Sequence, residues 1–509
     1  MAIKIDPRLT PKRLVPKIER VFDLSGQKLL SLEQSWKPED GTPVFTVKGR
    51  YTSRGWTEWT QGFQYGSALL QFDATGDGRF LEIGRRGTRK HMATHVSHMG
   101  VHDHGFNNVS TYGNLLRLMR EGRIPWHERE KDFYELALKV SGAVQAARWT
   151  RTLDGEGYIY SFNGPHSLFI DTMRTLRSLA LAHQLGHVLM EEGDQRVCLL
   201  RRLILHTRTT ALNNIYYGEN RDAYDVRGRV AHETIFNVRD DGCYRCANSQ
   251  QGYSPFSTWT RGLAWAILGF AEQLEFLCSL RNGEMESALY FNGRPPKDKQ
   301  RAALYQRLRK RHAVVALTPA DTRRICMRAG TAAADFYLAA ACADGIPMWD
   351  TGAPNLHRLP SNYLDKPADP FNAHEPVDSS AAAIAAQGLI RLGNHLLLQG
   401  DKKNGARYRQ AGLSVASTLF DEPYLSTRPR HQGLLLHSVY HRPNGWDYIA
   451  PGQRVPNGES SMWGDYHGRE LALLLLREAR GEGYLTFFGG IAPGPAPCVK
   501  RSARFPACE

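Results

Sequence analysis

Apolar residues recur at helical spacing wherever the pattern along the chain is clear. Ile170, Met173 and Leu176 lie three residues apart, and the stretch from Leu263 to Leu277 repeats a spacing of three and four. We therefore expect a helix over each of these stretches. The same reasoning predicts helices over residues 133–147, over 380–398 with a start at Asp378-Ser379, and over 469–480.

Other secondary-structure patterns are missing from the sequence. It has neither long alternating strands nor βαβ units with glycine-rich phosphate loops, so a Rossmann or TIM architecture finds little support. No repeat of fixed period occurs, which argues against a solenoid of consensus repeats. The remaining prediction is an all-α fold in which helices pack on helices, with a closed helical toroid as one arrangement.

The composition is that of an ordinary globular protein. Of 509 residues, 42% are hydrophobic, no apolar run reaches the length of a membrane span, and no apolar segment follows the basic residues near the start. These features predict a cytoplasmic protein without a membrane partner. The eight cysteines are too sparse for a disulfide scaffold, and the single pair Cys243 and Cys246 favours structural thiols over a zinc or redox site.

The net charge is strongly positive. The chain carries 65 Lys and Arg against 51 Asp and Glu, a formal charge of +14 that attracts anionic partners. The basic residues are dispersed, and no zinc-finger or RRM signature organises them, so no nucleic-acid partner is expected. Anionic oligosaccharide ends explain the same excess, and so does solubility alone.

Two acidic residues stand in contexts suited to proton transfer. Asp103 lies between two imidazoles in His102-Asp103-His104, and Asp171 lies at an apolar helix start in Phe169-Ile170-Asp171. Neighbouring charges and burial both change the pKa of a carboxyl group, which general acid and base catalysis requires. The structural alternative for each aspartate is a helix N-cap.

Other segments combine aromatic rings with polar groups that suit a sugar. The segment Gly55–Phe63 is rich in tryptophan, although a core aromatic turn would explain it equally. Ser249–Gly252 and Ser257–Trp265 bring Gln, Arg and Trp together. This mixture suits polyols and carboxylates, because arginine pairs with carboxylates and tryptophan stacks on ring faces.

Together with Pro347–Asp350, Asp378–Ala383 and Trp463–Tyr466, these segments resemble the unsaturated glucuronyl hydrolases, glycoside hydrolase family 88. Their order and spacing agree over roughly residues 50–480, and the most specific piece is Trp259–Trp265. The related unsaturated rhamnogalacturonyl hydrolases typically read Arg-Gly-Asn-Gly-Trp there, so Leu263-Ala264 favours the glucuronyl branch.

The resemblance implies a fold and a reaction. The fold is an (α/α)6 barrel. The substrate is an oligosaccharide that a lyase has cut, which ends in a 4-deoxy uronate with a C4=C5 double bond. Protonation of C4 places positive charge on C5 and the ring oxygen, water adds at C5, and the resulting hemiketal opens with loss of the glycosidic bond. The reaction needs neither an organic cofactor nor a metal.

The resemblance also implies roles for individual residues. Asp171 matches the acid/base and Asp103 the second essential acid. His232, Gln251 and Arg261 match groups that contact the uronate. The remaining substrate-site positions are the aromatic walls and two serines of a segment near the pocket, namely Trp59, Trp265, Ser379 and Ser380.

Two departures from the family pattern accompany this match. Residues 279–322, charged and containing Pro295-Pro296, predict an insertion, and Met173-Arg174-Thr175 follows Asp171 where a small or Asn-bearing run is expected. We therefore expect an extension packing on the barrel over 1–40, the catalytic barrel over 41–485 with its insertion, and a tail over 486–509. The oligomeric state has no signal in the sequence.

Three alternatives stay open. His91, His95, His98 and His102 recur at helical spacing and could form a metal site, although the Glu of an HExxH motif is missing. A barrel that only binds sugars would have lost one of its acids, and both Asp103 and Asp171 are present. A rhamnogalacturonan fragment is the nearest alternative substrate.

Overall fold

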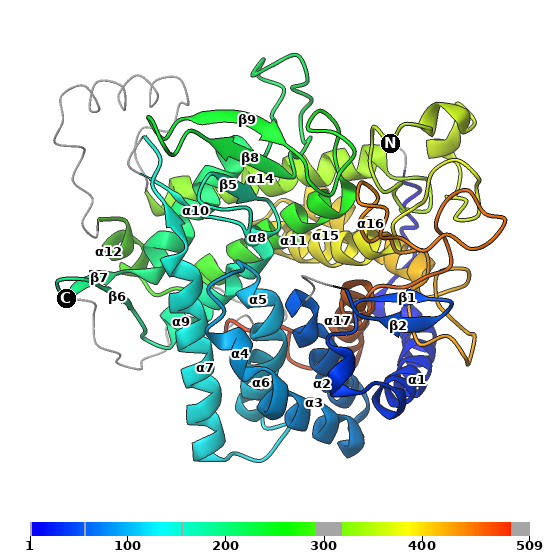
Figure 1. Cartoon of the computed structure of the whole chain (residues 1–509), viewed down its shortest axis with the longest axis horizontal. Helices are drawn as coiled ribbons and strands as arrows, with labels where there is room; N and C mark the ends of the chain where they lie inside the picture. Colours follow the sequence, from blue (N-terminus) through cyan, green and yellow to red (C-terminus); the bar gives the residue numbers. More distant parts are fainter. Residues whose placement is uncertain (1–2, 55–57, 154–155, 291–317, 490–509) are drawn as a thin grey trace.

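The computed structural model describes residues 3–54, 58–153, 156–290 and 318–489. Helices form two concentric layers in it (Figure 1). Six inner segments follow one another around a ring, and α17 returns to α2 to close it. In chain order these described segments are α2 (Gln61–Thr75), the run of α5 (His104–Asn107), η3 (Val109–Gly113) and α6 (Asn114–Arg120), the pair α8 (Thr172–Thr175) and α9 (Arg177–Gln184), α11 (Thr260–Ser279), α15 (Ser379–Leu398) and α17 (Met462–Arg480).

Six outer helices cover this ring within the same described residues. They are α1 (Pro11–Ser35), α3 (Gly78–His91), α7 (Glu128–Ala147), α10 (Leu199–Asn213), α14 (Pro319–Ala340) and α16 (Lys402–Leu419). Each packs on its inner neighbour, for example α16 on α15, α14 on α11 and α3 on α2. The arrangement is an (α/α)6 barrel, and the predicted all-α fold is confirmed.

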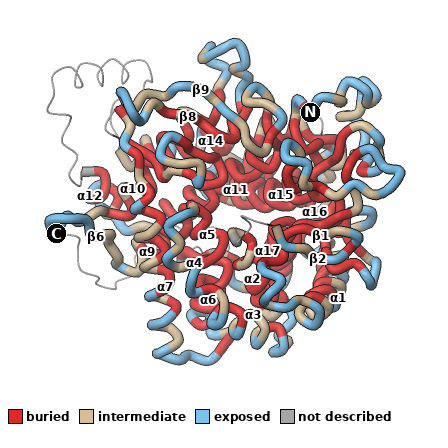
Figure 2. The backbone as a smooth tube through the Cα atoms, in the orientation of Figure 1, coloured by how far each residue is buried: buried red, intermediate tan, exposed pale blue. Residues whose placement is uncertain are grey.

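The inner helices are buried almost along their whole length (Figure 2). In α11 and α15 apolar or small residues occupy every side of the helix, as expected of helices enclosed by others. Gly388 shows how closely the two approach, because a Cβ atom there would lie 2.7 Å from the backbone nitrogen of Leu268. Small residues at this contact therefore set the spacing of the ring.

The helices predicted from apolar spacing are present, with shifted ends. The one expected over 380–398 is α15, whose first N–H groups are capped by Asp378, with the Ser380 nitrogen 3.0 Å from its carboxylate. Those expected over 133–147 and 469–480 are the ends of the longer α7 and α17. The stretch from Ile170 begins with a break, because α8 and α9 are separate short helices.

Among the residues that the structure describes, strands are few and short. Three hairpins pair β1 (Phe45–Val47) with β2 (Arg50–Thr52), β3 (Trp149–Thr150) with β4 (Tyr158–Ile159), and β6 (Leu189–Glu191) with β7 (Gln195–Val197). One antiparallel sheet has the order β5 (Ser167–Phe169), β8 (Glu233–Phe236), β9 (Tyr244–Asn248). Each strand lies in a loop between helices, which explains why strand patterns are weak in the sequence.

The predicted division of the chain is only partly described. The extension predicted over 1–40 contains α1, which contacts α17 and α2 as one of the outer helices. Of the predicted insertion, α12 (Glu284–Tyr290) and the start of α14 are described, whereas 291–317 and most of the predicted tail, 490–509, lie outside the described residues. The boundaries themselves stay predictions. Within the described part of the chain, no helix is both long and apolar enough to span a membrane.

Candidate active site

The three-stranded sheet brings separate parts of the chain to one place. Since its strands are antiparallel, the end of β5, the start of β8 and the end of β9 lie at the same edge. Asp171 follows β5, His232 precedes β8, and Gln251 follows β9. The Ile170 N–H donates to the His232 carbonyl at 3.0 Å. This hydrogen bond fixes the backbone next to Asp171 relative to His232.

Asp103 reaches the same place through a helix contact. It precedes α5, and Gly105 in that helix lies so close to α8 that a Cβ atom would be 2.3 Å from the carbonyl oxygen of Thr175. Only glycine fits this approach, because the neighbour is backbone. The starts of α5 and α8 are therefore side by side, and Asp103 and Asp171 stand at these starts.

One imidazole lies between the two acids. His102 Nε2 is 2.9 Å from Asp171 Oδ1 and 3.7 Å from Asp103 Oδ1. All three side chains are buried, and neither aspartate makes a side-chain cap bond to the helix that it precedes. Both aspartates thus occupy N-cap positions, as the capping alternative expects, but without the side-chain cap bond, and their carboxylates face His102.

The three groups have different charge preferences. Burial raises the pKa of Asp103, and the neighbouring charge of Asp171 adds to this effect. Burial also acts on Asp171, but the charge and hydrogen bond of His102 outweigh it and hold the pKa of Asp171 below its ordinary value. Burial lowers the pKa of His102 less than the two carboxylates raise it. The arrangement favours an ionised Asp171, a protonated His102 and a proton on Asp103.

A second group of predicted residues surrounds Arg261. Its Nη2 donates to Gln251 Oε1 at 3.0 Å and its Nη1 lies 3.2 Å from Asp378 Oδ2, while its guanidinium lies 4.6 Å from the centre of the Trp259 ring and 4.8 Å from that of Trp463. Arg261 is fully buried. It is therefore held rigidly by the protein before any ligand arrives.

The two predicted serines contact residues that surround Arg261. Ser380 Oγ donates to Asp378 Oδ1 at 2.5 Å and accepts from Trp463 Nε1 at 3.0 Å, and Ser379 Oγ lies 3.3 Å from Ser438 Oγ. Both serines are completely buried. Their contacts orient Asp378 and Trp463, so their influence on a ligand acts through those side chains.

The two predicted aromatic walls differ in exposure. Trp59 is half-buried, and its ring stacks on Trp463 at 5.1 Å and touches Phe106 at 5.7 Å. Trp265 is 2% exposed, and its ring contacts Phe106 and His467. Trp59 can therefore present part of its surface to a ligand, while Trp265 belongs to the aromatic base beneath the site. Part of the tryptophan-rich segment, 55–57, lies outside the described residues.

Sequence reasoning missed two contacts near the acids. The motif already placed His102 beside Asp103 as an imidazole that can change its charge state, but not its hydrogen bond to Asp171. Phe162, 37% exposed, lies over the His102 ring at 6.1 Å and comes from a loop without any recognisable pattern. Its exposed aromatic surface borders the acid pair.

The histidines of the metal alternative do not converge. His91 stacks on Tyr65, His95 contacts Gln61 at 2.7 Å, and His102 faces the acids. No cluster of three or more His, Cys, Asp or Glu side chains with metal-binding geometry occurs in the described part of the chain. The histidine spacing therefore does not produce a common centre.

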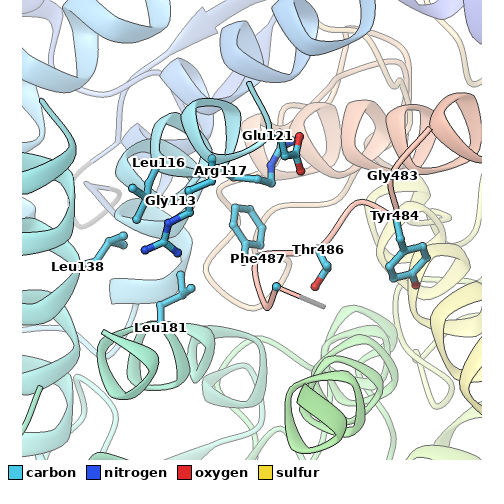
Figure 3. Close-up of a pocket in the computed structure, with 12 residues that line it drawn as sticks. Gly113, Leu116, Arg117, Glu121, Leu138, Leu181, Gly483, Tyr484, Thr486 and Phe487 are labelled. Carbon is cyan, nitrogen blue, oxygen red and sulfur yellow. Dashed lines mark hydrogen bonds and ion pairs between the residues drawn. The ribbon is translucent and has the colours of Figure 1, made fainter. Parts of the chain in front are cut away.

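One cavity in the described part of the chain lies apart from these residues. It has a volume of about 360 Å³ and is lined by residues of α6, α7, α9 and the segment that follows α17 (Figure 3). None of the predicted site residues lines it; its walls include Leu116, Arg117, Leu138, Leu181, Tyr484 and Phe487. The cavity and the acid pair are thus separate features.

Known proteins share this fold and a limited part of this sequence. No protein-family model matches the chain. It is 24% identical to an unsaturated chondroitin disaccharide hydrolase of Streptococcus pyogenes serotype M1 over 58% of this chain and 70% of that protein. It is 23% identical to an unsaturated glucuronyl hydrolase of Bacillus sp. strain GL1 over 86% of this chain and 90% of that protein. The chain is thus similar to unsaturated glucuronyl hydrolases over most of its length.

Solved structures of unsaturated glucuronyl hydrolases superpose on most of this chain. An unsaturated glucuronyl hydrolase specific for heparin superposes with a TM-score of 0.62 at 18% identity, covering 91% of this chain and 98% of that one. The Bacillus sp. GL1 enzyme superposes with a TM-score of 0.61 at 20% identity, covering 90% and 96%. At this identity the structural likeness establishes the fold, and the site has to be argued from its own residues.

Proposed function

We propose that this chain is a glycoside hydrolase that removes a 4,5-unsaturated glucuronate from the non-reducing end of lyase-generated oligosaccharides. The observation that carries the proposal is the pair of buried acids, Asp103 and Asp171, on either side of His102. Hydration of the double bond adds one proton at C4 and removes one proton from water. A pair in which one acid keeps its proton and the other is ionised suits both requirements.

The roles of the site residues follow from this reaction. Asp171 is the acid/base that exchanges protons with water and C4, and its ionised form is the one that can take a proton from water. Asp103 is the second acid, and its proton is available to the pair. The positive charge that develops on C5 is stabilised by the ionised carboxylate of the pair, Asp171.

Substrate binding is assigned to the surrounding groups. Arg261 and Gln251 are polar ligands of the uronate, and His232 lies beside it. Trp59 faces the sugar, with Trp265 as the base of the aromatic group, and Ser379 and Ser380 hold the Arg261 cluster in place. The positive net charge of the chain attracts the anionic substrate.

The sugar that follows the uronate is proposed from relatives. Two Streptococcus proteins similar to this chain are named unsaturated chondroitin disaccharide hydrolases. A Streptococcus agalactiae relative, at 16% identity and a TM-score of 0.54, is described in complex with dGlcA-GalNAc6S. We therefore place glycosaminoglycan disaccharides first and pectin-derived rhamnogalacturonan disaccharides second.

We also propose a cytoplasmic location. Cys326 and Cys342 are buried thiols in the structure, as is usual for proteins of a reducing compartment. Fractionation of cells that express the chain with its natural start tests this point, and recovery outside the cytoplasm would reject it.

The test of the activity follows the absorbance of the unsaturated uronate. Wild type and Asp171→Asn are mixed with unsaturated disaccharides from glycosaminoglycan, gellan and pectin, and Asp240→Asn, an exposed aspartate in a turn, is the matched control. Wild type and control should bleach the band, and Asp171→Asn should be slower by about 10²–10⁴-fold. Absence of bleaching with every substrate would reject the proposed function, and preference for the pectin product would move the chain to the rhamnogalacturonyl branch.

A further inference from the structure

The side chain of His232 is tightly enclosed by the protein. Its ring lies 4.5 Å from the Phe169 ring and 4.8 Å from the Trp259 ring, and only 2% of the residue is exposed. Strand β8 begins directly after it, and its own carbonyl accepts from the Ile170 N–H. The imidazole therefore has one fixed orientation.

Backbone contacts determine which ring nitrogen carries the proton. The Gln250 N–H donates to His232 Nδ1 at 3.0 Å, and the Gln251 N–H approaches the same atom at 3.4 Å. An N–H group can only be accepted by a lone pair, so Nδ1 carries no proton. In a neutral imidazole the proton is then on Nε2.

The opposite nitrogen has no protein partner. His232 Nε2 is fully buried and makes no hydrogen bond to any of the described residues. The charged and titratable groups that act on this imidazole are Asp171, His441, Arg261 and His102, which come from four different segments of the site. A buried N–H without an acceptor is costly, so a bound ligand that supplies an oxygen here gains a specific contact.

The imidazole also resists a second proton. Burial lowers the pKa of His232 to about 3, and the positive charges of His441, Arg261 and His102 act in the same direction, while Asp171 opposes them. A second proton would have to sit on Nδ1, where it would face the N–H groups of Gln250 and Gln251. The neutral form with its proton on Nε2 is thus favoured by geometry and by charge.

We propose that His232 is a fixed, neutral hydrogen-bond donor to an oxygen of the bound uronate and takes no part in proton transfer. This inference rests on the proposed function for the identity of the ligand. It separates the two imidazoles nearest Asp171: His102 sets the charge of the acid, whereas His232 orients the sugar beside it. Proton exchange is then confined to the two acids and His102.

The first experiment reads the tautomer directly. Protein labelled with ¹⁵N-histidine is studied by long-range ¹H–¹⁵N correlation spectroscopy over about pH 5–8, the range in which an ordinary histidine changes charge. The signal of His232 is identified as the one missing from His232→Asn. It should show a neutral ring protonated on Nε2 that does not change with pH. Titration in this range, or a proton on Nδ1, would overturn the inference.

The second experiment replaces His232 by two amide side chains, each of which reproduces one of the two ring nitrogens. In His232→Asn the side-chain oxygen reaches the position of Nδ1 and keeps the acceptor for Gln250, but the donor is lost. In His232→Gln the side-chain nitrogen reaches the position of Nε2. We expect an unchanged melting temperature and a roughly 10- to 100-fold lower kcat/KM for the Asn variant, as for loss of one hydrogen bond, with partial recovery in the Gln variant.

The pH profile separates a donor from a proton-transfer group. His232→Asn should lower the rate equally at all pH values, so that both limbs of the profile keep their midpoints. Loss or displacement of a limb would overturn the inference. If wild type bleaches no unsaturated disaccharide, the proposed function fails, but the spectroscopic result still decides the tautomer.

Discussion

Two regions of this molecule bury charged groups in opposite ways. In the acid pair, Asp103 and Asp171 share a single imidazole. In the interior of the barrel, Arg174 pairs with Glu272 and lies 2.6 Å from Glu470, so α8 is tied to α11 and α17. Arg174 and Asp171 are only three residues apart.

The difference between the two regions is the balance of charge. Although burial disfavours its ionisation, Glu470 faces the guanidinium groups of Arg174 and Arg177, which hold its pKa far below the ordinary value. This balance favours an ionised Glu470. In the acid pair two carboxyl groups face one cation, so one of the two carboxyl groups, Asp103, keeps its proton. Balanced buried charges fix the structure, and unbalanced ones can perform chemistry.

The largest expected effect comes from removing one acid of the pair. Asp103→Asn should lower kcat by about 10²–10⁴-fold, because one of the two proton-exchange groups is gone. Its stability should not fall, since a carboxyl group whose folded-state pKa is raised disfavours folding at any pH above its ordinary pKa. Steady-state bleaching and thermal melting measure the two effects. A variant that is destabilised but fully active would show that Asp103 serves the structure and not the reaction.

Removing a balanced charge should have the opposite outcome. Arg174→Met leaves Glu272 and Glu470 buried with fewer cations, which costs about 3–5 kcal/mol of unfolding free energy. The matched control is Arg20→Met, whose partner Asp421 is exposed, where about 0–1 kcal/mol is expected. Urea unfolding gives both values. Equal losses for the two variants would show that the interior network contributes no more than a surface pair.

The pH dependence sharpens the role of His102. Its pKa is raised, so the charged pair with Asp171 is complete below the ordinary histidine pKa and is lost as pH rises through the raised value. The pKa of Asp171 is lowered, so the pair is lost on the acid side as pH falls through that value. Wild-type activity should therefore be bell-shaped.

In His102→Gln the cation is gone and burial of Asp171 remains. The alkaline limb should disappear and the acid limb should move to higher pH, whereas His127→Gln, an exposed histidine before α7, should leave both limbs unchanged. Rate profiles of kcat/KM measure this. An unchanged profile in His102→Gln would mean that His102 does not control the charge of Asp171.

The smallest expected effect is that of a chelator. Neither region contains a described metal-binding cluster, and the proposed hydration requires no metal. Treatment with EDTA followed by removal of the chelator should leave the rate and the melting temperature unchanged. A loss of rate that added zinc restores would revive the alternative based on His91, His95, His98 and His102.

Much of the site was accessible from sequence because its residues stand in short motifs. Asp103 and Asp171 were found from their neighbours, and the start of α15 was found from its cap, Asp378. What could not be found was the contact between His102 and Asp171, which are 69 positions apart and meet only because α5 packs on α8. The burial of Trp265 could not be predicted either, because a tryptophan motif does not tell which ring is covered by other side chains.

The amino-acid sequence by itself determined the helices and their caps, because apolar spacing and capping residues act over a few positions. It also determined the family motifs. The tertiary structure alone decided the charge states of Asp103, Asp171 and His102, the proton position on His232, and the pairing of Arg174 with Glu272 and Glu470. These properties depend on burial and on distances between groups that are remote in the chain, and both exist only once the barrel has closed.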